Sequence, residues 1–124
     1  MKSLLDDNNI AIVIGGGNDQ SYCNASALMQ QQPDLGNIGV VNIDAHLDAR
    51  PLLDGNLAHS GSPFRQLLTD TAFNGVFYEF AVQGNQCSAE HAEFVQEHGG
   101  SLAWLSKVSL PLKFLLVSFW SFFF

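Results

Sequence analysis

Two short runs of apolar residues, at positions 10–14 and 38–43, constrain the fold of this chain more than any other feature. They read IAIVI and IGVVNI. Continuous apolar runs of this length, rich in β-branched residues, are typical of strands buried on both faces of a parallel sheet. Residues 19–32 between them predict a helix that ends near Pro33. The two runs lead directly into the polar segments GGGND and DAHLD.

The rest of the chain continues this alternation of strands and helices. Strands are predicted at 76–82 and 101–105, and a short helix is predicted at 63–68. A further helix begins at Ser88, a cap-type residue, and ends at Gly99-Gly100. The pattern predicts an α/β fold with a parallel sheet. In such sheets ligands bind beyond the carboxyl ends of the strands, which is where GGGND and DAHLD fall.

Charge and cysteine content narrow the expected partners and compartment. The length of 124 residues fits one domain, and its net charge of -7 disfavours a nucleic-acid partner, because an acidic surface repels phosphate backbones. Cys23 and Cys87 lack CxxC spacing, so a reducing cytoplasm is the simpler expectation. The N-terminal residues lack the pattern of a signal peptide. No apolar stretch is long enough to span a bilayer, so no membrane partner is expected.

Residues 109–124 differ in kind from the rest of the chain. They read SLPLKFLLVSFWSFFF and hold five of the ten phenylalanines, without a repeat that would mark one buried face. A soluble domain rarely exposes so large an aromatic patch at its end. We therefore interpret residues 1–108 as the domain and 109–124 as a hydrophobic tail produced by frameshift or truncation. The alternative is a membrane anchor or a partner-binding segment.

The strongest chemical signal is the motif NIDAHLDAR at residues 42–50. Asp44, His46 and Asp48 occupy every second position, so their side chains point the same way in an extended segment. Two carboxylates and an imidazole suit manganese or a similar divalent ion better than a soft metal. Such an ion lowers the pKa of water and provides a nucleophile near neutral pH. The alternative from spacing alone is a solvated turn in which Asp44 or Asp48 caps the following segment.

Several motifs together resemble the ureohydrolases, the family of arginase, agmatinase and formimidoylglutamase. The likeness covers roughly residues 4–108 and begins with IGGGND followed by DAHLDAR. HSGSPFRQLL at 59–68, FYEFAVQG at 77–84 and the later SAEHAEFVQEHGG stretch are most similar to formimidoylglutamase. The resemblance implies a three-layer, arginase-like α/β fold, present here in part. It also implies a binuclear manganese (Mn²⁺) centre and hydrolysis of a carbon–nitrogen bond in a linear amidine.

The resemblance implies a role for each metal ligand. Asp44 would bridge the two manganese ions, His46 would bind one ion and Asp48 the other. Asn18 stands where the family has the histidine of its GGGH motif, and an amide oxygen is a weaker donor to manganese than an imidazole. The family's later D-x-D pair has no counterpart, because the last acidic residue is Glu97. We therefore expect an incomplete centre, as in the middle of a longer chain, and no turnover by this polypeptide alone.

Both arginines of the chain are predicted to bind carboxylates of the substrate, because guanidinium groups hold carboxylates bidentately. Arg50 matches a family position near the amino-acid end of the substrate, and Arg65 is placed by the SGSPFR match. The resemblance also implies that Ser60 and Gly61, in the family's H-G-x-P segment, bind the substrate, with Ser60 at the histidine position and His59 one residue earlier. The alternative for each arginine is a surface salt bridge.

Three hypotheses about function remain open at this stage. The first is a formimidoylglutamase-like hydrolase of histidine catabolism, converting formiminoglutamate to formylglutamate and ammonia, and a homo-oligomer when full length. The second is a non-catalytic relative that lost a metal site at Asn18 and acts in assembly or regulation. The third is an interaction fragment anchored by its tail. His91 and His98 are expected on the surface of their helix.

Overall fold

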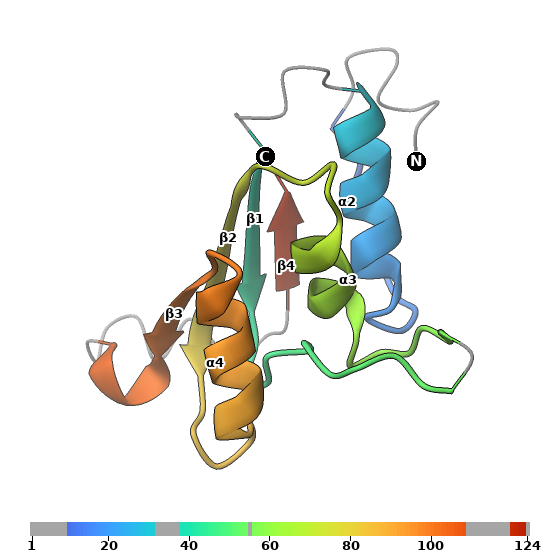
Figure 1. The fold of residues 1–124 in the computed structure, drawn as a ribbon. Coiled ribbons are helices and arrows are strands. Elements are labelled where there is room, and N and C mark those ends of the chain that lie inside the picture. Colours follow the sequence, from blue (N-terminus) through green and yellow to red (C-terminus); the bar gives the residue numbers. More distant parts are fainter. Residues whose placement is uncertain (1–9, 32–37, 55, 109–119, 124) are drawn as a thin grey trace.

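In the computed structural model of Figure 1, the described residues form a four-stranded sheet with helices packed against one face. The residues that the structure describes are 10–31, 38–54, 56–108 and 120–123. The strands lie in the order β3-β2-β1-β4. Their bounds are β1 (Gly39–Ile43), β2 (Val76–Val82), β3 (Ser101–Trp104) and β4 (Trp120–Phe123). β1, β2 and β3 are mutually parallel, which confirms the predicted parallel sheet, whereas β4 runs antiparallel to β1.

The central strands bury every second residue. Val40 and Asn42 on β1 are buried, as are Phe77 and Glu79 on β2. Side chains on a strand alternate between faces, and the register pairs Val40 with Phe77 and Asn42 with Glu79, so this buried set marks the face that the helices cover. Tyr78, on the opposite face, is 36% exposed. The described residues therefore form two of the three layers that the family resemblance implies.

Within the described part of the chain, three α-helices lie where the sequence predicts them. The helices, with one short 3-10 turn, are α2 (Gln20–Gln31), α3 (Pro63–Thr69), α4 (Ala89–Glu97) and η2 (Leu105–Lys107). Pro63 occupies the first turn of α3, where its missing N–H is not needed. Ser88 caps α4 because its hydroxyl accepts a hydrogen bond from the His91 N–H at 3.2 Å. Gly99, with φ of 84°, lies just beyond the end of α4 in the left-handed conformation.

The hydrophobic core lies between the sheet and these helices. Phe64 of α3 packs against Phe77 of β2, with 4.8 Å between ring centroids. α2 contributes Ala25 and Met29, which lie on one face of the helix because they are four residues apart. α4 contributes Val95. Burial of this apolar cluster holds the helices, and the loops between them, against the sheet.

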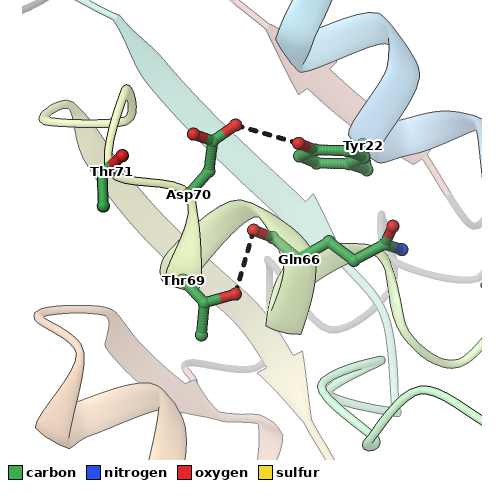
Figure 2. A pocket seen from close by; sticks show the side chains of 5 residues that line it. All are labelled: Tyr22, Gln66, Thr69, Asp70 and Thr71. Carbon is green, nitrogen blue, oxygen red and sulfur yellow. Dashed lines mark hydrogen bonds between the residues drawn. The ribbon is translucent and has the colours of Figure 1, made fainter. Parts of the chain in front are cut away.

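A pocket of about 350 Å³ lies where α2 meets the end of α3 (Figure 2). It is lined by Tyr22, Gln66, Thr69, Asp70 and Thr71. The Tyr22 hydroxyl donates a hydrogen bond to Asp70 Oδ2 at 2.9 Å, and so links the two helices. Burial, together with this bond and the Asp70 charge, raises the pKa of Tyr22. The residues predicted to bind metal or substrate do not line this pocket.

The strand predicted at residues 10–14 is wrong. This segment has no strand structure, and Ile10, Ile12 and Ile14 are 93%, 77% and 83% exposed. A strand requires a neighbouring strand to satisfy its backbone N–H and C=O groups. The edge of β1 is occupied by β4 rather than by residues 10–14. The apolar composition of the segment therefore does not lead to a strand here.

β4 comes from the C-terminal tail, for which the sequence pattern predicted no element. It pairs with β1 from Val40 opposite Phe123 to Ile43 opposite Trp120. Residues 109–119 and 124 lie outside the described residues, so the interpretation of the tail stays a prediction. Among the helices that the structure describes, none is long and apolar enough to cross a membrane.

Candidate metal centre

The loop that follows β1, residues 44–50 (the ligand loop), is fixed at both ends by backbone hydrogen bonds. At its start the Asp44 N–H donates to the Phe80 carbonyl at 3.1 Å, which ties the loop to β2. At its end the Arg50 N–H donates to the Gly61 carbonyl at 2.8 Å. The loop is therefore held at the C-terminal edge of the parallel strands, where ligands bind in α/β folds.

Burial of alternate residues sets the direction of the side chains of the ligand loop. Leu47 and Ala49 are buried in the core. Their neighbours His46 and Asp48 are only partly buried, and Arg50 is exposed. His46, Asp48 and Arg50 consequently line one pocket. Asp48 has a φ of 42°, in the left-handed region that residues other than glycine rarely adopt.

Asp44 and His46 contact each other directly. Asp44 Oδ1 accepts a hydrogen bond from the His46 N–H at 2.9 Å and lies 3.1 Å from His46 Nδ1. The Asp44 side chain is 14% exposed and the His46 side chain 43% exposed. A proton on Nδ1 completes the second bond to the carboxylate and leaves the Nε2 lone pair to bind a metal.

Asn18 lies beside Asp48. Its side-chain amide donates a hydrogen bond to Asp48 Oδ2, and its own Oδ1 accepts one from the Ser21 hydroxyl at 2.6 Å. Burial, and next the Asp44 carboxylate, raise the pKa of Asp48, whereas the Asn18 bond and two neighbouring basic side chains act in the opposite direction. The two carboxylates of the ligand loop therefore repel each other.

The donor types at the ligand loop suit a hard divalent ion, but the donors are not gathered around one point. Manganese accepts carboxylate, carbonyl and imidazole donors. Within residues 10–31, 38–54, 56–108 and 120–123, no three His, Cys, Asp or Glu side chains are placed to hold a common ion. Asp44 is turned toward His46, and Asp48 toward Asn18. The described side chains therefore do not by themselves form the ligand set of a pair of metal ions.

A buried carboxyl group near the ligand loop was not identified from the sequence. Glu79 on β2 is 0% exposed. Its Oε2 accepts a hydrogen bond from Asn42 Nδ2 at 3.0 Å, and its Oε1 has no partner among the described residues. Burial raises the pKa of Glu79 well above its usual value, and the charges of Asp48 and Asp44 add to this effect. The sequence feature that could have indicated this buried carboxyl is a single glutamate at an inward-facing position of an otherwise apolar strand.

A pocket of about 460 Å³ lies beside the ligand loop (the ligand-loop pocket). It is lined by His46, Leu47, Asp48, Arg50, Asn85, Gln86, Cys87, Ser88 and His91. β2 has a β-bulge between Phe80 and Val82, where Ala81 has φ of 70°. The chain that follows β2 supplies the pocket residues 85–88. His91 was predicted on the helix surface, and it is partly buried and lines this pocket. The sequence could not show this, because helical periodicity does not indicate which loop the first turn of α4 faces.

Gly61 packs closely against the side chain of Arg50. A Cβ atom at Gly61 would lie 3.1 Å from Arg50 Cδ, so a larger residue would displace the arginine. The His59 ring lies with Nε2 3.0 Å from the Pro51 carbonyl and accepts the Gly61 N–H at Nδ1, 3.2 Å away. These contacts fit a neutral imidazole with its proton on Nε2. Ser60 is exposed, and its predicted role in substrate binding stays a prediction.

Arg65 is engaged outside the ligand-loop pocket. Its Nε donates a hydrogen bond to the Ala49 carbonyl at 2.8 Å, and its guanidinium carbon lies 3.7 Å from the centre of the Phe94 ring. These contacts join α3 to the ligand loop and to α4. They favour a structural role, and the predicted binding of substrate by Arg65 stays a prediction.

Curated relatives of this chain are formimidoylglutamases. The Streptococcus pyogenes protein of this name is 31% identical over 102 residues, which are 82% of this chain and 28% of that protein. The Aeromonas hydrophila formimidoylglutamase is 35% identical over 81 residues, which are 65% of this chain and 25% of that protein. The chain thus spans about a quarter of the length of these relatives.

Solved structures and the family model agree with this likeness. The crystal structure of Trypanosoma cruzi formiminoglutamase with Mn²⁺ matches with a TM-score of 0.79 and 43% identity, over 94% of this chain and 41% of that one. The Bacillus subtilis formimidoylglutamase structure, 22% identical, has the same fold, with a TM-score of 0.75 over 92% of this chain and 35% of that one. The arginase family model matches residues 1–108. The predicted family and fold class are confirmed, and the chain belongs to the arginase family.

Proposed function

We propose that this chain forms part of a formimidoylglutamase-type hydrolase, and that its ligand loop supplies metal donors. The observation that carries the proposal is the pair Asp44 and Asp48 in one loop at the C-terminal edge of the parallel strands, where burial, and next the Asp44 carboxylate, raise the pKa of Asp48. A divalent cation at such a pair offsets the repulsion and favours the charged form of both carboxylates. The similar Trypanosoma cruzi formiminoglutamase, whose crystal structure contains Mn²⁺, supports manganese as the cation.

The proposed reaction adds water to a linear amidine and releases ammonia. The formimino carbon of formiminoglutamate gains an oxygen from water and loses one nitrogen as ammonia, which leaves formylglutamate. When bound, manganese supplies the Lewis acidity that makes water nucleophilic near neutral pH. Of the chain's own residues, Asp44 and Asp48 would carry the negative charge that holds the ion. Arg50, which lines the ligand-loop pocket, would orient the substrate through a carboxylate.

Activity is proposed for the whole protein rather than for these residues alone. The described residues provide too few converging donors for two ions, and this chain spans about a quarter of the length of its curated relatives. We infer that further donors lie outside the described residues. The ligand loop and its pocket would then form one side of the complete centre.

Manganese titration followed by electron paramagnetic resonance tests the proposal. The chain is expected to bind manganese, and Asp44→Asn and Asp48→Asn are each expected to weaken binding by at least ~10-fold, because each removes a charged donor. Asp54→Asn, at an exposed position beyond the ligand loop, is the matched control and should bind like the wild type. Equal affinity in all four proteins would place the ion elsewhere and contradict the proposal.

The second candidate function, a non-catalytic relative, has one observation in its favour. The Asn18 amide donates to Asp48, and so occupies a carboxylate oxygen with an N–H group instead of offering a metal donor. If the unaltered chain binds no manganese and Asn18→His does, this candidate is favoured. Manganese binding with Asn18 in place supports the hydrolase.

A further inference from the structure

The ligand-loop pocket has two walls of different origin. One wall is the ligand loop itself, with Asp48 and Arg50. The other comes from residues 85–88 and the first turn of α4, where His91 lies. Because the Ser88 hydroxyl binds the His91 N–H at 3.2 Å, this turn is held in a fixed position relative to the start of the helix. The pocket has the volume of a site for a small molecule, about 460 Å³.

Two basic side chains in this pocket, those of Arg50 and His91, make no side-chain hydrogen bond to the described residues. The rings of the other three histidines make contacts: that of His46 with Asp44, that of His59 with Pro51 and Gly61, and that of His98 with the Phe94 carbonyl. The His91 imidazole makes no hydrogen bond within the described ranges. The guanidinium of Arg65 is taken by Ala49 and Phe94. The guanidinium of Arg50 forms no ion pair within 4.0 Å among the described residues, although its charge acts on Asp48, and its backbone N–H is bonded to the Gly61 carbonyl.

We propose that His91 and Arg50 together bind the carboxylate end of an anionic, amino-acid-like substrate, with His91 as the residue that determines specificity. This inference rests on the proposed function and assigns the distal part of the same site. Among the described residues that line the pocket, the one carboxylate is Asp48, on the side of the metal donors. A ligand with an amidine at one end and carboxylates at the other therefore finds negative charge at one wall. Away from Asp48, the donors Arg50, on the ligand loop, and Asn85 and His91, on the facing wall, are available to its carboxylates.

Binding of N-formyl-L-glutamate to the 124-residue chain, measured by calorimetry without metal, tests this inference. The matched neutral probe is the diamide of the same compound. The wild type is expected to bind the dicarboxylate at least ~10-fold more tightly than the diamide, because charge-assisted hydrogen bonds are the stronger ones. His91→Gln is expected to lower dicarboxylate affinity by roughly tenfold and to leave diamide binding unchanged. His91→Lys, which places a cationic donor at the same position, is expected to recover most of the affinity.

His98→Gln is the control, because His98 lies at the other end of α4, outside the pocket. It should bind both probes like the wild type. Full dicarboxylate affinity in His91→Gln, or equal affinity of the wild type for both probes, would overturn the inference. If His91→Gln does not fold, the shift of the His91 imidazole signal in nuclear magnetic resonance on adding the dicarboxylate decides the question, and an unmoved signal overturns it.

The outcomes separate this inference from the proposed function. Manganese binding that depends on Asp44 and Asp48, with no selective binding of the dicarboxylate, would overturn the role of His91 and leave the metal site intact. Selective dicarboxylate binding that depends on His91, with no manganese binding, would support the pocket and contradict the proposed function.

Discussion

Asn18 and Asp48 lie 30 residues apart in the sequence, yet the Asn18 side-chain amide donates a hydrogen bond to the Asp48 carboxylate. This bond joins the turn before α2 to the ligand loop. An N–H donor partly offsets the charge of this partly buried carboxylate, and a cation would offset it more completely. The contact therefore places Asn18 at the candidate metal centre, in an orientation that hydrogen-bonds the ligand loop.

Asn18→His is expected to strengthen manganese binding by at least ~10-fold, because an imidazole nitrogen is a stronger donor than an amide oxygen. Paramagnetic resonance titration measures the change. Asn18→Ala is the matched control, since it removes the same hydrogen bond to Asp48 without adding a donor, and it is expected to gain no affinity. An equal gain in both variants would mean that loss of the hydrogen bond, rather than the new donor, is responsible.

Glu79→Gln is expected to remove part of the pH dependence of stability. The pKa of Glu79 is raised in the folded protein above the usual value of 4.5, so folding retains a proton that the unfolded chain releases. The resulting stability is fully present below about pH 4.5 and is lost as the pH rises through the higher folded-state pKa. Between about pH 5 and pH 8, the wild type should lose at least ~1 kcal/mol more of unfolding free energy than Glu79→Gln.

Urea unfolding at the two pH values measures this difference. Glu93→Gln, at an exposed position on α4, is the control and should follow the wild-type profile. Indistinguishable profiles for the wild type and Glu79→Gln would contradict a pKa of Glu79 that is raised in the folded protein.

Ala81→Gly is expected to leave stability unchanged or to raise it by up to ~1 kcal/mol, because glycine adopts a positive φ without the steric penalty that alanine pays. Ala81 has φ of 70° at the bulge in β2 and is buried. Ala81→Val should instead lower the unfolding free energy by about 2 kcal/mol, since a β-branched side chain is strained in that conformation. Thermal unfolding checks both, and a Val variant as stable as the Gly variant would exclude strain at this bulge.

Ser88→Ala is expected to lower the unfolding free energy by about 1 kcal/mol, because it removes the cap that accepts the His91 N–H. Chemical denaturation measures the loss. Ser88→Asp, which can also accept this hydrogen bond, should retain wild-type stability. The same variants test dicarboxylate binding in the ligand-loop pocket. Ser88→Ala should weaken binding because the first turn of α4 frays. Ser88→Asp should weaken binding because it adds a negative charge, although the turn stays folded.

Local sequence patterns were sufficient for most of the secondary structure. β2 was predicted with its observed bounds, and α2, α3, α4, β1 and β3 were each predicted to within about two residues. Buried runs, a first-turn proline, a serine cap and a pair of glycines are signals within a few residues of chain. The apolar run at 10–14 failed because a strand also depends on a partner. That partner position is filled by β4, from the far end of the chain.

The sequence by itself determined which residue types could bind a metal: the alternation of Asp44, His46 and Asp48 and the glycine-rich segment with Asn18 are local. Only the tertiary structure decided which of these side chains meet. It brought Asn18 to Asp48, buried Glu79 where the charges of Asp48 and Asp44 act on it, and placed His91 across the pocket from Arg50. The physical reason is that burial and electrostatic coupling depend on distances between segments remote in sequence, and these are set by packing of the core.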